Sequence, residues 1–422
     1  MGKYNLVHII AGGEYKTPLV ASQVFDRAEA QATTEGVNKP VSVSVWIMAP
    51  MREVFDKSSK KQIEGLKKRC PHSNIEIIGG ISRFHNWPAV PTLKSLRKKL
   101  AGDTVFCFRG EASFEWAYVL KKIFPADAYI LDVRGFWPLE RLVNENIVEE
   151  KDMLPAQLEM YHKDLARLKD AIQTANKVCT VSEPLLDMLI EKAGAPKDAV
   201  VIPCCVKDVI PADSRERVRK ELNIEGSTAI LYLGGTQKYQ HLDDLVIPFL
   251  KSAISLSEKN VAVIITQNRD KMMELLTKYE VNKERVRMLS VPQDKVADYL
   301  AGMDIGLLLR APSVLINTSQ PVKFGEYLSA GIPVVLEEGM KKAADILDEH
   351  QIGCVVKISG KEQQWEIDNE VKKALDWFGL NKSTLQVNTR RFVEHQYTWK
   401  ANVQKERTMY IQALEDSKAI NK

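Results

Sequence analysis

The sequence predicts an α/β protein built of two doubly wound, Rossmann-like domains in tandem, and three observations support this fold class. Strand-like apolar runs alternate with helical patterns along the whole chain, which is typical of a parallel sheet with helical crossovers. A length of 422 residues favours two cores rather than one. A polar, charged segment after residue 206 separates two series of strands and therefore marks the boundary.

Each half of the chain contains its own series of expected strands. In the first half these strands lie in NLVHII, VSVSVWI, NIEIIGG, DTVFCF, DAYILDV and KVCTVS. In the second half they lie in AILYLGG, VAVIITQ, VRMLSV, DIGLLLR, GIPVVLE and GCVVKI. We therefore expect one Rossmann-like domain at 1–206, a second at 207–395 and a closing helix at 396–422 that crosses back to the first domain.

The composition is that of a globular protein, with 45% hydrophobic and 27% charged residues. No apolar run approaches the roughly 18 residues of a membrane helix, and the N-terminus lacks a signal-peptide layout, so we expect a cytoplasmic protein. Six scattered cysteines form no CxxC pair, which argues against a zinc site or a disulfide framework. The adjacent Cys204 and Cys205 lie in an apolar run and are expected to be buried small residues rather than a redox pair.

Positive charge is concentrated in one region. Residues 51–100 hold 12 Lys and Arg against 4 Asp and Glu, while the whole chain has a net charge of only +4. This excess has two interpretations: a solvated helix face, or a patch that contacts anionic lipid headgroups at the inner face of a membrane or attracts an anionic substrate. Nucleic-acid binding is not expected, because the basic segments lack interleaved aromatic residues.

Glycines follow the first strand of each half. Gly12 and Gly13 end the first strand of the chain, and Gly234 and Gly235 precede Thr236 in the second half. Such glycines let the backbone approach a phosphate, but tight strand-to-helix turns use glycine as well, and both interpretations stay open. Neither loop completes G-x-G-x-x-G, which argues against a nicotinamide or flavin dinucleotide.

The segment SQPVKFGEYLSAGIPVV at 319–335 contains the most informative cluster of polar residues. Pro321 fits the start of a helix and Gly331 its end, so Glu326 is expected near the ligand-facing end of its domain. Just upstream, DIGLLLR ends an apolar strand with Arg310. A nucleotide diphosphate sugar would use both side chains, since a carboxylate accepts hydrogen bonds from ribose hydroxyls and a guanidinium pairs with diphosphate oxygens.

These segments resemble the donor-binding signature of bacterial GT-B glycosyltransferases of the GT4 type (glycosyl transferases group 1). In that family a strand ending near Arg precedes a P-x-K-x-x-E-Y-L-x-x-G-x-P-V-V element. The resemblance covers most of the chain and is strongest over residues 175–340. Further matching segments are KVCTVSEPLLDMLIEK, AVVIPCCV, AILYLGGTQKYQHLDDLV, VRMLSVPQDKVADYLAGMDIGLLL and YTWKANVQKERTMYIQAL.

The resemblance implies an enzyme that moves a sugar from a nucleotide diphosphate sugar, with UDP as the expected nucleotide, to a glycan or lipid-linked acceptor. It implies retention of configuration, no cofactor, no obligatory metal, and a role in polysaccharide or cell-envelope glycan biosynthesis. The first domain would bind the acceptor and the second the donor, in a cleft between them. The expected catalytic cations are Arg310 and Lys323. The expected donor-binding residues are Gly12, Gly13, Gly235, Thr236, Lys238, Val291 and Glu326.

The sequence departs from the family pattern at two places. Many members carry a first glutamate eight positions before the second, and Thr318 stands there in this chain. Gln240 and His241 replace the usual Lys-Gly after the donor-domain glycines, so Lys238 is only a nearby candidate for the diphosphate lysine. The donor sugar therefore stays open.

The segment AYILDVRGFWPLERL places Asp132 and Arg134 after an apolar strand. Similar D-x-R-G elements occur in related transferases at the cleft, which makes both residues catalytic candidates on the acceptor side, but a surface salt bridge around a glycine turn is an equal alternative. Ser182 resembles the strand-end serine of the family and equally fits the N-cap of the following helix.

Two other functions remain open from the sequence. A sugar-nucleotide epimerase of the same fold is the nearest enzymatic alternative, although no acid/base pair for it is evident. A catalytically inactive sugar-nucleotide-binding module is the second, because the first glutamate of the family is missing at Thr318.

Overall fold

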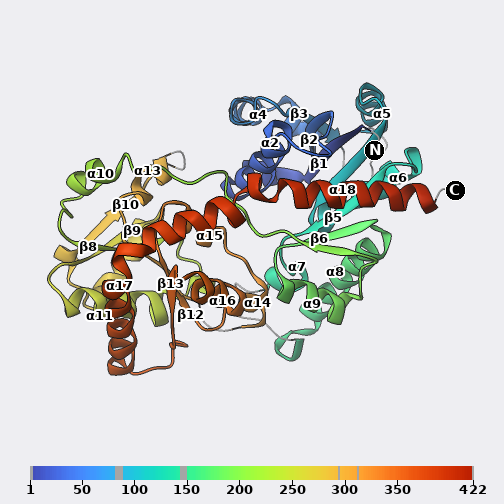
Figure 1. Cartoon of the computed structure of the whole chain (residues 1–422). Helices are drawn as coiled ribbons and strands as arrows, with labels where there is room; N and C mark the ends of the chain where they lie inside the picture. Colours follow the sequence, from blue (N-terminus) through green and yellow to red (C-terminus); the bar gives the residue numbers. More distant parts are fainter. Residues whose placement is uncertain (1–2, 81–88, 143–149, 293–294, 311–312, 421–422) are drawn as a thin grey trace. The chain divides into compact units, whose positions relative to one another are not determined.

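The computed structural model describes residues 3–80, 89–142, 150–292, 295–310 and 313–420, and these form two compact units (Figure 1). The first unit takes its residues from Met1–Pro138, Pro155–Lys207 and Thr398–Lys422. The second takes them from Leu139–Leu154 and Asp208–Tyr397.

The first unit contains a seven-stranded parallel sheet with the order β3-β2-β1-β4-β5-β6-β7. Most of its residues are buried, as expected for strands covered on both faces, which explains why they form nearly continuous apolar runs in the sequence. Its strands are β1 (Tyr4–Ala11), β2 (Ser42–Pro50), β3 (Asn74–Gly80), β4 (Asp103–Arg109), β5 (Ala128–Val133), β6 (Lys177–Thr180) and β7 (Ala199–Val201).

The second unit contains a six-stranded parallel sheet with the order β10-β9-β8-β11-β12-β13. Its strands are β8 (Thr228–Leu233), β9 (Asn260–Ile265), β10 (Val286–Leu289), β11 (Ile305–Leu308), β12 (Val334–Glu337) and β13 (Gly353–Val356). In both sheets the first strand of the unit lies beside the fourth, so the strand order reverses there. The predicted fold class, two doubly wound α/β domains, is confirmed.

Helices connect the strands in both units. Those of the first unit include α2 (Asp26–Thr33), α3 (Met51–Phe55), α4 (Lys57–Arg69), α5 (Val90–Lys99), α6 (Gly110–Ile123), α8 (Pro155–Thr174), α9 (Glu183–Ala193) and α18 (Trp399–Ile420). Those of the second include α10 (Arg215–Glu221), α11 (Ile247–Leu256), α12 (Arg269–Lys278), α13 (Val296–Leu300), α14 (Val314–Thr318), α15 (Val322–Ser329), α16 (Lys341–His350) and α17 (Gln364–Phe392). Among the helices that the structure describes, not one combines the length and apolarity needed to cross a bilayer.

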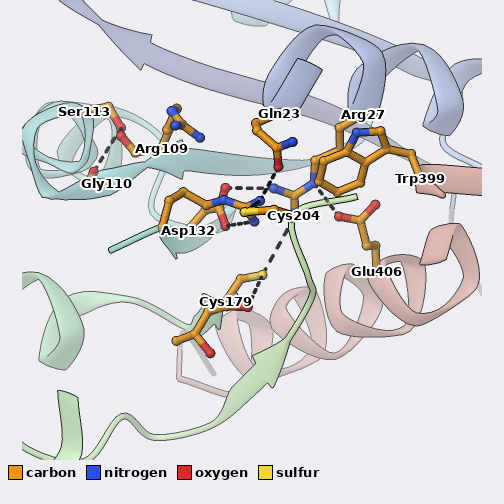
Figure 2. A network of polar contacts seen from close by, with 12 residues as sticks. Gln23, Arg27, Arg109, Gly110, Ser113, Asp132, Cys179, Cys204, Trp399 and Glu406 are labelled. Carbon is orange, nitrogen blue, oxygen red and sulfur yellow. Dashed lines mark hydrogen bonds and ion pairs between the residues drawn. The ribbon is translucent and has the colours of Figure 1, made fainter. Parts of the chain in front are cut away.

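The last helix, α18, belongs to the first unit, where it packs against α2, β4 and β5 (Figure 1). Its contact with α2 and β5 includes charged groups. Arg27 of α2 lies between the carboxylates of Asp132 and Glu406, with 2.8 Å from its Nη1 to Asp132 and a direct hydrogen bond from its Nε to Glu406 (Figure 2). The three residues are at most 3% exposed, so this is a fully buried ion-pair network.

We expect Glu406→Ala to lower the free energy of unfolding of the first unit by about 3–5 kcal/mol, because removing one partner of a buried pair leaves the other charge uncompensated. Urea unfolding combined with hydrogen exchange of the α2 and α18 amides measures this loss. Glu35→Ala is the matched control, since the Glu35 side chain is 85% exposed in its pair with Lys39 and should contribute little. Equal effects of the two substitutions would contradict the prediction.

Candidate functional site

Three side chains predicted from the sequence lie together in the second unit. Arg310 follows the carboxyl end of β11, and Lys323 and Glu326 lie three residues apart on α15, hence on one helix face. All three interact electrostatically with at least one of the others. The carboxyl ends of parallel strands are where open α/β sheets bind ligands, so the cluster lies at the expected edge of its sheet.

The position of α15 is fixed by Tyr327. Its hydroxyl accepts a hydrogen bond from the Leu233 amide at 3.0 Å, at the end of β8. Its ring packs against Gly306 of β11, where an added Cβ would come within 2.5 Å of a ring carbon. Gly331, at φ +76°, then turns the chain toward β12 in a conformation that favours glycine. Packing therefore holds the helix that carries Lys323 and Glu326 against two strand ends.

The environment of Lys323 disfavours its charged form. Burial and, to a smaller extent, the charge of Arg310 lower the pKa of this amine, Glu326 opposes the shift, and the resulting pKa is about 7. The amine lies 5.5 Å from the centre of the Tyr232 ring and 3.4 Å from the Gln240 side-chain oxygen. Burial also raises the pKa of Glu326, against the attraction of Lys323. A bound anion would favour the protonated amine.

The surroundings of Arg310 also leave part of its side chain without a hydrogen-bond partner in the described residues. Its guanidinium lies 5.6 Å from the centre of the Tyr239 ring. Burial lowers its pKa, and its Nε has no hydrogen-bond partner among the residues that the structure describes. A buried donor without an acceptor is costly, and diphosphate oxygens would supply the acceptors that it lacks.

The loop after β8 borders this cluster. An added Cβ at Gly234 would come within 2.9 Å of the Tyr232 hydroxyl and would also collide with the Lys323 amine, so this glycine makes room for the lysine. Gly235 accepts a hydrogen bond from Tyr232 at 2.7 Å. Lys238 is exposed, in the 3₁₀ turn Lys238–Gln240. Thr236, on the same loop, is half-buried.

Val291 lies two residues beyond the carboxyl end of β10, which is an outer strand of the second sheet. It is buried, and its carbonyl accepts a hydrogen bond from Gln267 at 3.0 Å. Thr318 stands where the sequence pattern has its first glutamate. It is buried as well, and its hydroxyl donates to the Leu315 carbonyl at 3.0 Å.

Glu337, at the carboxyl end of β12, belongs to the same electrostatic cluster and was not predicted from the sequence. The residue is fully buried. Its Oε2 accepts from the Gly339 amide, while Oε1 has no hydrogen-bond partner within the described part of the chain. Burial raises the pKa of its carboxyl to about 7, although Arg310 and His241 oppose this. The sequence signal that could have identified this residue is a glutamate at the end of the apolar strand VVLE.

The remaining predicted residues lie in the first unit. Gly12 and Gly13 begin a 3₁₀ turn after β1, and open space surrounds the position of a Cβ at each. One carboxylate oxygen of Asp132 pairs with Arg27 in the buried network, and the other lies 3.4 Å from Arg134. Burial raises the pKa of Asp132, but the charges of Arg134, Arg27 and Arg109 outweigh it and hold the pKa at about 2. The Asp132–Arg134 pair is therefore buried, not a surface salt bridge.

Other members of this network were missed by sequence reasoning. Figure 2 shows Arg27, Arg109, Gln23 and Glu406 around Asp132. Arg134 donates to Gln23 at 2.5 Å and contacts the Cys204 sulfur at 3.4 Å. The two helices that contribute Arg27 and Glu406, α2 and α18, are far apart in sequence, so no local spacing signals the pair.

Two smaller sequence questions are answered by the structure. Ser182 is the N-cap of α9, where its hydroxyl accepts a hydrogen bond from the Leu185 amide at 3.2 Å. Cys204 and Cys205 are both buried and both free thiols, as predicted.

Comparison with known proteins identifies the fold. No family model matches the sequence, and no curated protein does. The solved structure of HepE from Anabaena in complex with UDP is 12% identical, with a TM-score of 0.63 over 97% of this chain and 99% of that one. Sucrose-phosphate synthase from Thermosynechococcus elongatus is 14% identical, with a TM-score of 0.63 over 98% and 100% of the two chains. A glycosyltransferase from Rickettsia africae gives 13% identity and a TM-score of 0.63 over 98% and 100%.

The fold is that of GT-B glycosyltransferases. This agrees with the fold that the sequence resemblance implied, while the narrower GT4 assignment rests on the sequence motifs alone. At 11–14% identity the structural similarity supports the fold alone, and the chemistry follows from the residues of this chain.

The raised pKa of Glu337 predicts a specific pH dependence of stability. The ordinary pKa of a glutamate is 4.5 and that of folded Glu337 about 7, so between these values the folded state holds a proton that the unfolded state has released. Stability should therefore fall as pH rises through this window, by at most about 1.4 kcal/mol per pH unit. Glu337→Gln should abolish this fall and be more stable than the wild type at pH 8.

Urea unfolding at pH 5 and pH 8 measures the difference. Glu274→Gln on the exposed side of α12 is the control, which removes the same charge without changing a buried site. A Glu337→Gln variant that tracks the wild type at both pH values would contradict the prediction.

Proposed function

We propose that this protein is a glycosyltransferase that moves a sugar from a nucleotide diphosphate sugar, with UDP as the nucleotide, to a glycan or lipid-linked acceptor. The observation that carries this proposal is the cluster of Arg310, Lys323 and Glu326 at the ligand-binding edge of a sheet in a protein with the GT-B fold. The structures of HepE with UDP and with UDP-glucose support the choice of nucleotide.

In this proposal each residue of the cluster has a separate role. Glu326 accepts hydrogen bonds from the ribose hydroxyls, while Arg310 and Lys323 bind the diphosphate. The loop Gly235–Thr236, with Lys238 nearby, brings backbone close to the phosphates, and the Val291 segment lies toward the nucleobase. The sequence resemblance also assigns Gly12 and Gly13 to donor binding.

The chemistry follows from these charges. Negative charge grows on the diphosphate as the glycosidic bond breaks, and groups that bind this charge more strongly in the transition state accelerate the reaction. The Nε of Arg310 lacks an acceptor in the described residues, so this nitrogen is available to the leaving group. Lys323 gains charge when it binds the anion. The proposal also includes retention of configuration and membership of GT4, and both rest on the sequence motifs.

On the acceptor side, Asp132 holds the guanidinium of Arg134, and we assign to Arg134 the contact with the acceptor. A carboxylate already engaged by two guanidinium groups has little capacity left for a substrate. Asp132 therefore acts on the reaction by positioning Arg134.

The proposal also includes contact with an anionic membrane. The lysines of α4 are exposed at 57, 60, 61, 67 and 68, and the neighbouring Phe55 is 71% exposed. An exposed aromatic ring beside cations is a combination that favours the headgroup region. Arg97 of α5 contributes less than the sequence suggested, because it is paired with Asp127 at 2.7 Å.

The function is tested by incubating the protein with a panel of UDP-sugars and measuring release of UDP. Transfer or donor hydrolysis supports the proposal. Interconversion of UDP-sugars without UDP release would instead indicate an epimerase, and UDP-sugar binding without turnover an inactive binding module.

We expect Glu326→Ala to weaken UDP binding at least tenfold. Hydrogen bonds to a charged group contribute roughly 1.5–3 kcal/mol each, and about 1.4 kcal/mol corresponds to a factor of ten. Isothermal titration calorimetry on the folded variant gives the dissociation constant, with the exposed Glu338→Ala as control. An unchanged dissociation constant for Glu326→Ala would remove the ribose role from this residue.

Arg310→Ala should reduce kcat by a larger factor than it weakens UDP binding, because the interaction strengthens as the leaving diphosphate gains charge. Turnover by UDP release and affinity by calorimetry are compared with those of Arg217→Ala, a half-exposed arginine of α10. Equal losses in kcat and affinity, or a loss in affinity alone, would show that Arg310 serves only ground-state binding.

A further inference from the structure

The Arg109 side chain, at the carboxyl end of β4, is only 12% exposed, and one of its guanidinium nitrogens has no hydrogen-bond acceptor among the described residues. Its Nη1 is inaccessible to solvent and has no partner among the described residues. The nearest carboxylate is that of Glu14, 3.5 Å from Nε, and the Glu14 side chain is 44% exposed. Burial lowers the pKa of Arg109, and the charge of Arg134 lowers it further. A buried cation in this state is costly unless a ligand supplies acceptors.

The Arg134 guanidinium, whose charge acts on Arg109, has Gln23 and Asp132 as partners but also contains one nitrogen without an acceptor among the described residues. The Arg134 side chain is only 9% exposed, and its Nε also lacks a hydrogen-bond partner within the described residues. The charges that face Arg109 are those of Arg134, Asp132 and Glu14. Asp132 favours the charged form of both arginines, but it also pairs with Arg27 and Arg134, and the net effect of burial and these charges still lowers the pKa of Arg109.

The backbone after Arg109 is open and begins a helix that has no side-chain cap. Gly110 begins the 14-residue helix α6 at φ +68°, and a Cβ there would meet nothing within 4 Å. The N-cap residue, Arg109, makes no side-chain cap hydrogen bond. Figure 2 shows the Arg109 side chain beside Gly110 and Ser113 at this helix start. The open turn at Gly12 follows β1, which pairs with β4 at the point where the strand order reverses.

We infer that the acceptor carries a phosphoryl group and that Arg109, Arg134 and the start of α6 bind it. Two guanidinium groups and a helix N-terminus together match the charge and the several acceptor oxygens of a phosphate ester. The inference rests on the proposed function, since it names the chemical class of the acceptor. The phosphoryl group is not consumed; it anchors the acceptor while another of its groups receives the sugar.

The test measures phosphate binding in an Arg310→Gln, Lys323→Gln background, which removes both proposed diphosphate-binding cations of the second unit and separates the result from the donor site. Calorimetry with inorganic phosphate and with glucose 6-phosphate should show binding that glucose does not. Adding Arg109→Gln should weaken phosphate binding at least tenfold, whereas Arg52→Gln, which changes an exposed arginine of α3, should leave it unchanged. Arg109→Gln breaks no hydrogen bond to a described residue, so we expect its thermal unfolding to match that of the parent.

Vesicles containing phosphatidic acid form the second arm. Binding that depends on Arg109 identifies a lipid phosphate, and Arg109-dependent binding of glucose 6-phosphate alone identifies a soluble sugar phosphate; both support the inference. Three results would overturn it: no Arg109-dependent phosphate binding, preference for glucuronate over glucose 6-phosphate, or loss of UDP affinity on Arg109→Gln in the otherwise wild-type protein. Failure of the wild type to bind UDP would contradict the proposed function but not the phosphate site.

Discussion

The first unit depends on one buried cation. Arg27 lies between Asp132 and Glu406, so a single guanidinium joins α2, the end of β5 and the final helix α18. Three further interactions strengthen this junction: Gln31 donates to Glu406 at 2.7 Å, the Trp399 indole donates to the Ser22 carbonyl at 2.8 Å, and the Trp399 ring lies 5.4 Å from the Arg27 guanidinium. Because the carboxylate of Asp132 is fixed in this way, Arg134 is held at the sheet edge.

Both units share an unusual electrostatic feature at their sheet edges. Arg109 and Arg134 in the first unit, and Arg310 in the second, each contain a buried nitrogen without a partner in the described residues. Such groups reduce stability in the absence of a ligand, and they are retained where a ligand completes their hydrogen bonds. Arg109 ends β4 and Arg310 follows β11, and each of these strands lies at the point where the strand order of its sheet reverses; Arg134 follows the next strand, β5.

The sequence predicted the fold better than it predicted the site. Buried parallel strands such as AYILDV form continuous apolar runs, so their positions and the two-domain α/β class could be read directly. Arg310, Lys323 and Glu326 lie within 17 residues of one another, around a helix whose start and end are marked by Pro321 and Gly331, so they could be predicted as neighbours from a local stretch of sequence. Arg27 and Glu406 are separated by 379 positions, and only the packing of α18 on α2 makes them neighbours. Arg109 looked like an ordinary strand-end residue because burial cannot be seen locally.

The charges around α15 can be understood as one coupled system. Burial raises the pKa of Glu326 and Glu337 and lowers that of Lys323, so without a ligand each of these groups is biased toward its neutral form. Neutral groups reduce the desolvation cost of a buried cluster, and the guanidinium of Arg310 is left as its most persistent charge. A diphosphate bound beside Arg310 would reverse this bias at Lys323, because an adjacent anion favours the protonated amine. With a ligand-free pKa of about 7, the lysine would take up a proton on binding at neutral or higher pH. The cluster can therefore match its charge to the ligand while it avoids a permanently buried excess of positive charge.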